Sequence, residues 1–182
     1  MIFEGLVLLF CLWLNYNANR FSDSKSKKCT YPSYDIFHSN ISCKLMHHPY
    51  LSDLLLLFTA LQWLTVSSQI TTASFFLKTA FFYFIRAVTL RLTVGFASPR
   101  YYFGLHHNAK NGTNNHFMDL TISGHVGLTT LYCLDLCLLG NNWHRIFAVV
   151  NLINSVMMNL LIGDHYSSDL WLGFIIPCLI YW

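Results

Sequence analysis

The sequence predicts an all-α, polytopic membrane protein with six transmembrane helices. The first observation is composition: the chain is 54% hydrophobic and only 10% charged, whereas a soluble domain usually carries about 25% charged residues. The second is that apolar windows of the ~17–25 residues that cross a bilayer recur along the chain. The net charge of +3 is modest, and no nucleic-acid partner is expected.

Six apolar windows define the expected spans. They lie at 2–16, 54–70, 74–96, 117–139, 143–163 and 170–182, and together they form a single transmembrane domain over residues 1–182. The first window has an alternative interpretation as a signal peptide. However, no positive residue precedes it, Glu4 interrupts it, and no clear small-residue cleavage site follows. Both interpretations leave the next loop on the non-cytosolic side.

The segments between the spans differ greatly in length. The longest polar loop covers 17–48 and a second covers 97–116, whereas 71–73 and 140–142 are very short. Short connections are typical of antiparallel neighbours. The second and third spans, and the fourth and fifth, are therefore expected to form tight hairpins.

The two long loops carry conflicting signals about orientation. Each contains a glycosylation sequon, at Asn40 and at Asn111, and such sites are modified in the lumen. Cys29 and Cys43 share the first loop and either pair there as a disulfide or stay free. Most Lys and Arg residues also lie in these loops, which by the positive-inside rule makes them cytosolic. We expect the lumenal orientation, because cations beside a phosphate-handling site have another reason to be there.

Two short polar motifs interrupt the apolar sequence. Thr-Ile-Ser-Gly-His ends at His125, and Asp-His-Tyr-Ser-Ser-Asp contains His165 and ends at Asp169. The chain between the histidines would be roughly 60 Å long as a helix, about twice the thickness of a ~30 Å hydrocarbon core. The chain is thus expected to cross the membrane and return, which brings both motifs to one face.

The two motifs contain the parts of a phosphoryl-transfer site. His165 and Asp169 are four residues apart, which predicts one helical face and a carboxylate that fixes the imidazole tautomer. His125 is expected to approach from the next hairpin and to protonate a leaving oxygen. Ser123 is expected to donate hydrogen bonds to phosphate, and Gly124 lets the substrate come close. The alternative is structural, since Ser167, Ser168 and Asp169 are all good helix-capping residues.

Arg86 lies inside the third expected span, where an ionisable side chain costs at least ~2.5–3.5 kcal/mol and usually faces an interior site. A lipid phosphate or an internal carboxylate is its expected partner. Lys78 and His144 are expected at the surface. The adjacent histidine pairs at 47–48 and 106–107 diverge in regular structure, and no Cys-x-x-Cys or His-Glu-x-x-His spacing occurs. We therefore expect no metal site.

The motifs resemble those of the lipid phosphate phosphatase superfamily and, more closely, its sphingomyelin synthase branch. Residues 119–125, with Asp119 six residues before the histidine, resemble the third family motif, and 164–169 resemble the fourth. Residues 86–89, with Pro99, resemble the second, and 31–35 faintly resemble the first. Simple lipid phosphatases have an arginine where this chain has Asn159.

This resemblance implies a covalent mechanism in a six-helix core. His165, oriented by Asp169, attacks the phosphorus of phosphatidylcholine or another glycerophospholipid and displaces diacylglycerol, with His125 as acid. Ceramide then accepts the head group. Asp119, Asp164 and Tyr166 are expected to contact the substrate alongside the residues above. No cofactor is needed, and a homo-oligomer is compatible with this chemistry. The site faces the lumen or cell exterior, in the Golgi, endoplasmic reticulum or plasma membrane.

Three alternatives stay open. A lipid phosphatase or phosphodiesterase would use the same site with water as acceptor. A non-catalytic lipid-binding or scramblase-like relative would keep the fold alone. A transporter would use intramembrane His and Asp side chains as a proton relay, although the sequence shows no inverted repeat.

Overall fold

The computed structural model describes residues 1–26, 48, 50–93, 122–163 and 165–182. Within these residues every regular element is an α-helix, so the all-α prediction is confirmed. The helices are α1 (Ile2–Ser26), α2 (Tyr50–Leu64), α3 (Gln69–Leu92), α6 (Gly124–Leu139), α7 (Asn142–Ile162) and α8 (Ser167–Tyr181).

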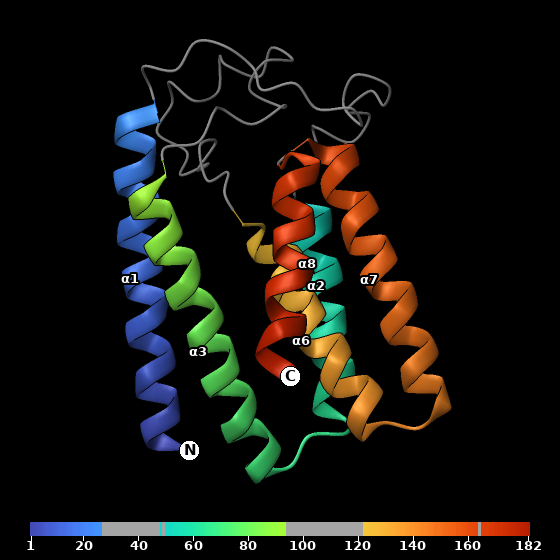
Figure 1. Ribbon diagram of the computed structural model, residues 1–182. Helices are drawn as coiled ribbons and strands as arrows, with labels where there is room; N and C mark the ends of the chain where they lie inside the picture. The colour runs from blue at the N-terminus through green and yellow to red at the C-terminus, as the bar shows by residue number, and fades with distance from the viewer. Residues whose placement is uncertain (27–47, 49, 94–121, 164) are drawn as a thin grey trace.

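The helices pack as a pair and a cluster. α1 lies along α3, while α6 packs against α7, α8 and α2 (Figure 1). Contacts of α3 with α6 and α8 join the two groups. α1, α3 and α7 end at one end of the bundle, where α2, α6 and α8 begin; this is the upper end in Figure 1. The motifs at the starts of α6 and α8 therefore share that end.

The distribution of side chains is that of a membrane protein. α3 and α7 are each long and apolar enough to cross a bilayer, and α2, α6 and α8 are shorter apolar helices. Large apolar side chains are exposed along whole helix faces, as at Ile146 and Ile153 on α7, while Arg86, Asn151 and Asn159 are buried. A soluble protein rarely exposes such continuous apolar surface. The prediction that all six helices span stays a prediction.

The prediction that the first helix ends at residue 16 is wrong. α1 continues to Ser26, into the segment expected to be a polar loop. Asn15, Asn19 and Ser22 lie at helical spacing and are buried. Their polar face packs in the bundle, because Arg86 on α3 donates hydrogen bonds to both asparagines. The polarity of this segment thus reflects an interior contact.

The break between α2 and α3 also differs from the expected one. It covers residues 65–68 instead of 71–73. The reason is local: the Ser68 hydroxyl accepts a hydrogen bond from the Thr71 backbone N–H at 3.3 Å, and the Thr71 hydroxyl accepts one from the Ser68 N–H at 2.6 Å. This reciprocal capping box starts α3 at Gln69.

Only one of the two expected hairpins forms a packed pair. α6 and α7 pack together across a short turn, where the Asn141 side chain caps α7. α2 and α3 diverge instead: α3 lies along α1, and α2 lies against α6 and α7. Trp63 and Phe75 meet near the connection, with ring centroids 4.5 Å apart.

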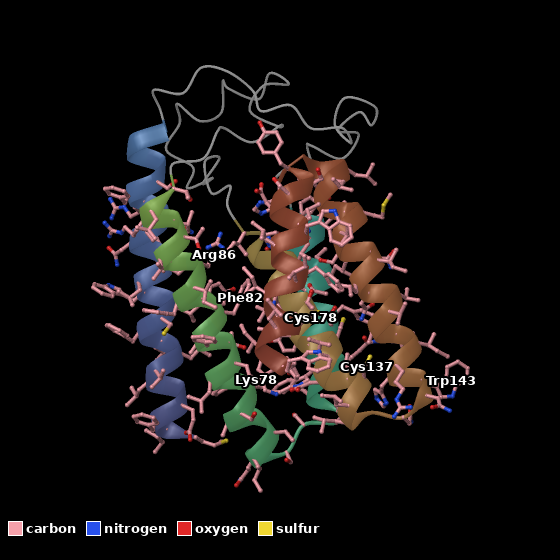
Figure 2. The ribbon with its side chains drawn as sticks, in the orientation of Figure 1. Lys78, Phe82, Arg86, Cys137, Trp143 and Cys178 are labelled. Carbon is pink, nitrogen blue, oxygen red and sulfur yellow. The ribbon has the colours of Figure 1, made fainter. Side chains whose placement is uncertain are left out.

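One face of α3 carries its main contacts with α6. Lys78, Phe82 and Arg86 follow each other at four-residue spacing along this face (Figure 2). The Lys78 Nζ lies 3.9 Å from a carboxylate oxygen of Asp135, and the lysine side chain is only 28% exposed. The prediction that Lys78 is a surface residue is therefore wrong. His144, by contrast, belongs to the exposed cap of α7.

Gly127 is required by close packing against Phe82. A Cβ atom at Gly127 would lie 2.0 Å from the Phe82 Cζ. We expect Gly127→Ala to lower the free energy of unfolding by about 1–3 kcal/mol, as overpacked cores do, and Phe82→Leu to restore part of it. Thermal unfolding in detergent measures both. Gly5→Ala is the matched control, because nothing lies within 4 Å of a Cβ there. An equal loss with and without Phe82→Leu would contradict this explanation.

Candidate functional site

The starts of α6 and α8 are joined by a backbone hydrogen bond. The Ser123 N–H donates to the Asp169 carbonyl oxygen at 3.0 Å. Gly173 permits this approach, since a Cβ there would lie 2.8 Å from the Ser123 carbonyl oxygen. Ser123 also caps α6, its hydroxyl accepting from the Val126 N–H. The two motifs that are far apart in the sequence therefore meet, as their spacing predicts.

Gly163 ends α7 immediately before the second motif. Its φ is 77°, in the left-handed region that favours glycine, and its N–H donates to the Asn159 carbonyl oxygen. The turn directs the chain from α7 to the buried His165. This helix-ending glycine was a readable sequence signal for the end of α7.

His165 and Asp169 lie close together, although not on one helical face. α8 begins at Ser167, so His165 precedes the helix and the expectation of a helical i, i+4 pair is wrong. The His165 Nδ1 lies 3.9 Å from the Asp169 Oδ2, and both side chains are buried. This distance is too long for a hydrogen bond. The Nδ1 has no hydrogen-bond partner among the residues that the structure describes.

Asp169 also acts as a helix cap. Its Oδ2 accepts a hydrogen bond from the backbone N–H of the buried Tyr166 at 3.0 Å, and its Oδ1 accepts one from the Ser168 hydroxyl at 3.3 Å. The capping alternative is therefore correct for Asp169. The same bonds fix its carboxylate beside His165, so the structural role and the chemical role are compatible.

His125 pairs with a carboxylate that the sequence analysis missed. Its Nε2 lies 2.8 Å from the Oδ1 of Asp53, in the first turn of α2 and just before the expected span. An ionised carboxylate only accepts hydrogen bonds, so the Nε2 carries the proton. This hydrogen bond lowers the pKa of Asp53 below its ordinary value, against the opposing effect of partial burial. The only sequence signal was an acid at a helix start, which the helix dipole also favours.

Arg86 supports the turn that leads into α6. Its guanidinium is buried; the Nε donates to the Ile122 carbonyl oxygen at 2.9 Å, and the Nη1 donates to the side-chain oxygens of Asn15 and Asn19 at 2.6 and 3.3 Å. These three acceptors are neutral oxygens. A Cβ on Gly124 would lie 3.6 Å from the Nε, an ordinary contact. The guanidinium therefore lies directly beside the first motif.

Several expected site residues are not brought together or fall outside the described residues. Within the described ranges, no hydrogen bond joins His125 to His165, and no group of three or more His, Cys, Asp or Glu side chains is arranged to hold a metal ion. The residues that lie outside the described ranges are Asp119, Asp164, Asn40, Asn111, Cys29 and Cys43.

The arrangement favours anion binding and proton transfer. Two helices begin side by side, and helix N-termini attract phosphate through their free N–H groups and dipoles. A buried guanidinium lies beside one of them. Two imidazoles each lie close to a carboxylate, and imidazoles in such pairs can act as nucleophile and as acid or base.

Comparison with known families agrees with this chemistry. Residues 118–182 match the family model described as PAP2 superfamily C-terminal. The matched segment contains both histidine motifs together with α6, α7 and α8. Members of this superfamily are membrane-associated phosphatases and phosphoryl-transfer enzymes that act on lipids. The match agrees with the lipid phosphate phosphatase superfamily as a whole and does not single out the sphingomyelin synthase branch. Searches of curated proteins and of solved structures gave no match.

Proposed function

We propose that this protein transfers phosphocholine, or a related phospho-head group, from a glycerophospholipid to ceramide and releases diacylglycerol. One observation carries the proposal: the bond between Ser123 and Asp169 joins the helix that carries His125 to the turn that carries His165. The family match supports lipid phosphoryl chemistry. The transfer to ceramide rests on the resemblance to sphingomyelin synthases and on Asn159, which stands where phosphatases have arginine.

In the first half-reaction the His165 Nε2 attacks the lipid phosphorus. The bond between phosphorus and the diacylglycerol oxygen breaks, its electron pair goes to that oxygen, and the Nδ1 of His125 supplies the proton. The attack requires a proton on the His165 Nδ1, donated to Asp169. The present 3.9 Å separation must shorten by about 1 Å, and catalytic hydrogen bonds often tighten in this way when substrate binds.

In the second half-reaction the ceramide hydroxyl gives its proton to the His125 Nδ1. Its oxygen attacks the phosphorus, and the bond between phosphorus and His165 breaks, which restores the imidazole. His125 returns to its protonated form, with Asp53 holding its Nε2 throughout. The cycle needs no soluble cofactor, since imidazole supplies both the nucleophile and the proton transfers.

The phosphate is proposed to lie at the start of α6, beside Ser123, Gly124 and the guanidinium of Arg86. The dipoles of α6 and α8 favour negative charge at this position. Asp119, Asp164 and Tyr166 are proposed to contact the substrate on the basis of the resemblance. The proposed partners are phosphatidylcholine or another glycerophospholipid, ceramide and diacylglycerol.

The proposed location is a membrane of the secretory pathway, with the site facing the lumen or cell exterior. The sequons at Asn40 and Asn111 support it, because both fall between expected spans whose ends share the side of the histidine motifs.

The proposal is tested with the full chain in liposomes, supplied with fluorescent ceramide and phosphatidylcholine, phosphatidylethanolamine or phosphatidylinositol. We expect a new phosphosphingolipid with one donor, whose head group identifies that donor. Cleavage of the donor without transfer would establish the phosphatase or phosphodiesterase alternative. Folded protein without turnover on any donor would contradict both enzymes and favour a non-catalytic lipid-binding protein.

Asp53 is expected to position His125, and Asp53→Asn tests this role. We expect transfer to slow about fivefold, because an exposed ion pair is worth up to about 1 kcal/mol. Because the pKa of Asp53 is lowered in the folded protein, the pair with His125 stabilises the fold at pH values above the pKa of this carboxyl in the unfolded chain. That stabilisation is lost as the pH falls through the pKa of Asp53 in the folded protein. The difference in melting temperature from wild type should therefore be present at pH 7 and vanish in acid.

Glu4→Gln is the control for Asp53→Asn, since Glu4 also lies in the first turn of a helix, at the far end of the bundle. It is expected to leave the transfer rate unchanged. An Asp53→Asn protein with the wild-type rate at every pH would contradict the positioning role.

A further inference from the structure

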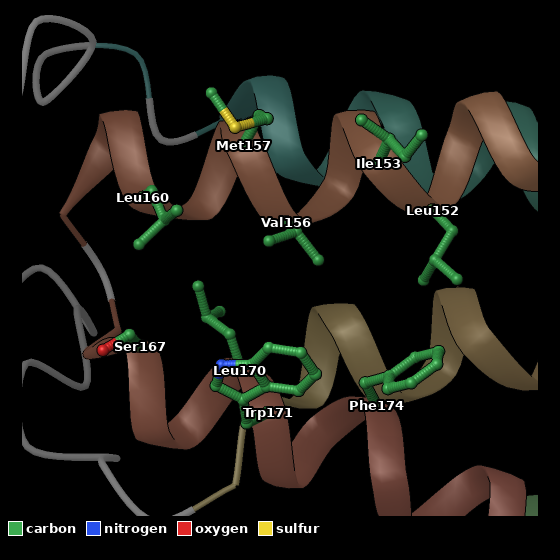
Figure 3. A pocket seen from close by; sticks show the side chains of 9 residues that line it. All are labelled: Leu152, Ile153, Val156, Met157, Leu160, Ser167, Leu170, Trp171 and Phe174. Atoms are coloured by element: carbon green, nitrogen blue, oxygen red, sulfur yellow. The ribbon is translucent and has the colours of Figure 1, made fainter. Parts of the chain in front are cut away.

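An apolar groove lies between α7 and α8 (Figure 3). Its volume is about 350 Å³. Nine side chains line it, all of them apolar except one serine: Leu152, Ile153, Val156, Met157, Leu160, Ser167, Leu170, Trp171 and Phe174.

The polar end of the groove is at the candidate site. Ser167, the first residue of α8, lies between His165 and Asp169 in the second motif. From there the groove follows α8 to Phe174 and α7 back to Leu152. This makes it roughly 10–12 Å long at about 1.5 Å per helical residue, or about a third of a ~30 Å hydrocarbon core.

The groove is closed on the inside and open on the outside. Its floor is formed by Leu160 and Leu170, which pack with the fully buried Val126, the residue after His125 on α6. On the outer rim Ile153, Met157 and Trp171 are exposed. A molecule in the groove would thus have membrane lipid on one side and the helix that carries the proposed acid on the other.

We propose that this groove binds one acyl chain of the phospholipid donor, with the phosphate at the Ser167 end, beside His165. This inference rests on the function proposed above and names where its lipid substrate is held. The volume lies at the lower end of the ~300–1,000 Å³ of ligand pockets, so the groove accepts part of one chain and not a whole lipid. A polar head group is excluded from the end of the groove near Leu152 and Phe174, because the side chains there offer no hydrogen-bond partner.

Because the groove is short, it contacts only the part of the acyl chain that is nearest the head group. Methylenes beyond the first third of the hydrocarbon core lie past Leu152 and Phe174, in bulk lipid. Holding the upper part of the acyl chain adds binding energy for a lipid whose phosphate lies at the level of His165. Such uniform binding lowers KM and leaves kcat unchanged.

Photo-crosslinking tests the groove independently of turnover. The full chain is placed in liposomes with phosphatidylcholine that carries a diazirine in the upper third of one acyl chain, and labelled peptides are mapped. We expect labelling to concentrate on the lining residues of α7 and α8. Val156→Trp, which fills the groove, should lower that labelling about tenfold. Val150→Trp makes the same change on an exposed part of α7 outside the groove and should leave it unchanged.

Ile153→Trp is the second groove variant, since Ile153 lies on the exposed rim and outside the buried cluster. It keeps the test decisive if Val156→Trp fails to fold. Uniform labelling of all the outer apolar faces, or equal labelling in the Val156→Trp and Val150→Trp proteins, would overturn the proposal and leave only bulk lipid at this surface.

Kinetics separate this inference from the proposed function. For long-chain phosphatidylcholine, the groove variants should raise KM about tenfold with little change in kcat, because the binding of the chain is lost and the chemistry is retained. A lower kcat at unchanged KM would overturn the chain-binding role. Groove-specific labelling in a protein without turnover would sustain the groove and reject the transferase.

Discussion

His165→Ala is expected to reduce the transfer rate about 10⁴-fold or more, as removal of a catalytic nucleophile does in other enzymes. The side chain is buried at the start of α8, and its Nδ1 faces Asp169 without a described hydrogen-bond partner. In the proposed mechanism this nitrogen donates to Asp169 when substrate binds, while the Nε2 attacks the phosphorus. Alanine removes both nitrogens, so neither step can occur.

His144→Ala is the matched control for this prediction. His144 lies at the opposite end of α7, where its ring belongs to the exposed cap of that helix. We expect this variant to keep the wild-type rate per folded molecule. Turnover is measured with the fluorescent ceramide assay, and folding by thermal unfolding in detergent. A folded His165→Ala protein that keeps the wild-type rate would reject the phospho-histidine mechanism.

Asp169→Asn separates the two roles of that side chain. Loss of the cap alone costs about 1 kcal/mol of stability, and an asparagine keeps an oxygen that can accept from the Tyr166 N–H. The variant should therefore fold close to normally. It loses the charge that stabilises the His165 proton, so the rate should fall steeply while the melting temperature changes little.

The meeting of the two motifs could be predicted from the sequence because it depends only on helix rise and bilayer thickness. The expected fifth and sixth spans, 143–163 and 170–182, also end and begin close to α7 and α8. The polar residues between them were interpreted as one helical face, whereas α8 starts only at Ser167, after His165. His165 and Asp169 come together through a cap and not through helical periodicity.

Side-chain pairs between residues far apart in the chain could not be predicted from the sequence. Asp53 and His125 are far apart in the chain, and nothing in the local pattern of α2 distinguishes a partner from a helix-start acid. Other signals were present and overlooked. Asn15 and Asn19, at helical spacing in an apolar segment, marked an interior contact, which proved to be Arg86. Asp135, an acid inside an expected span, was a second such signal.

Asp135 joins four helices at the end of the bundle away from His125 and His165. The Trp63 Nε1 on α2 donates to its Oδ2 at 2.8 Å, and the Tyr181 hydroxyl on α8 donates to its Oδ1. Lys78 on α3 lies 3.9 Å from the same Oδ1, with its Nζ over the Tyr181 ring. Asp135 itself is buried on α6. It follows His125 by roughly 15 Å along the helix axis.

Asp135→Ala is expected to destabilise the fold by about 3–5 kcal/mol, because it leaves the Trp63 N–H and the Tyr181 hydroxyl without their acceptor, at about 1–3 kcal/mol for each unsatisfied group. For a chain of this size that corresponds to a fall in melting temperature of roughly 10 °C in detergent. Asp135→Asn keeps an oxygen acceptor for Trp63 or Tyr181 and should lose less.

The transfer rate per folded molecule of the Asp135 variants should stay close to wild type, since the cluster touches neither histidine. A wild-type melting temperature for Asp135→Ala would mean that the four-helix contact contributes little. A folded Asp135→Ala protein with no turnover would instead assign this carboxylate to the chemistry. Melting temperature and transfer rate together decide between two roles for Asp135. It either stabilises the fold, as its three neighbouring side chains indicate, or belongs to a proton path to the site.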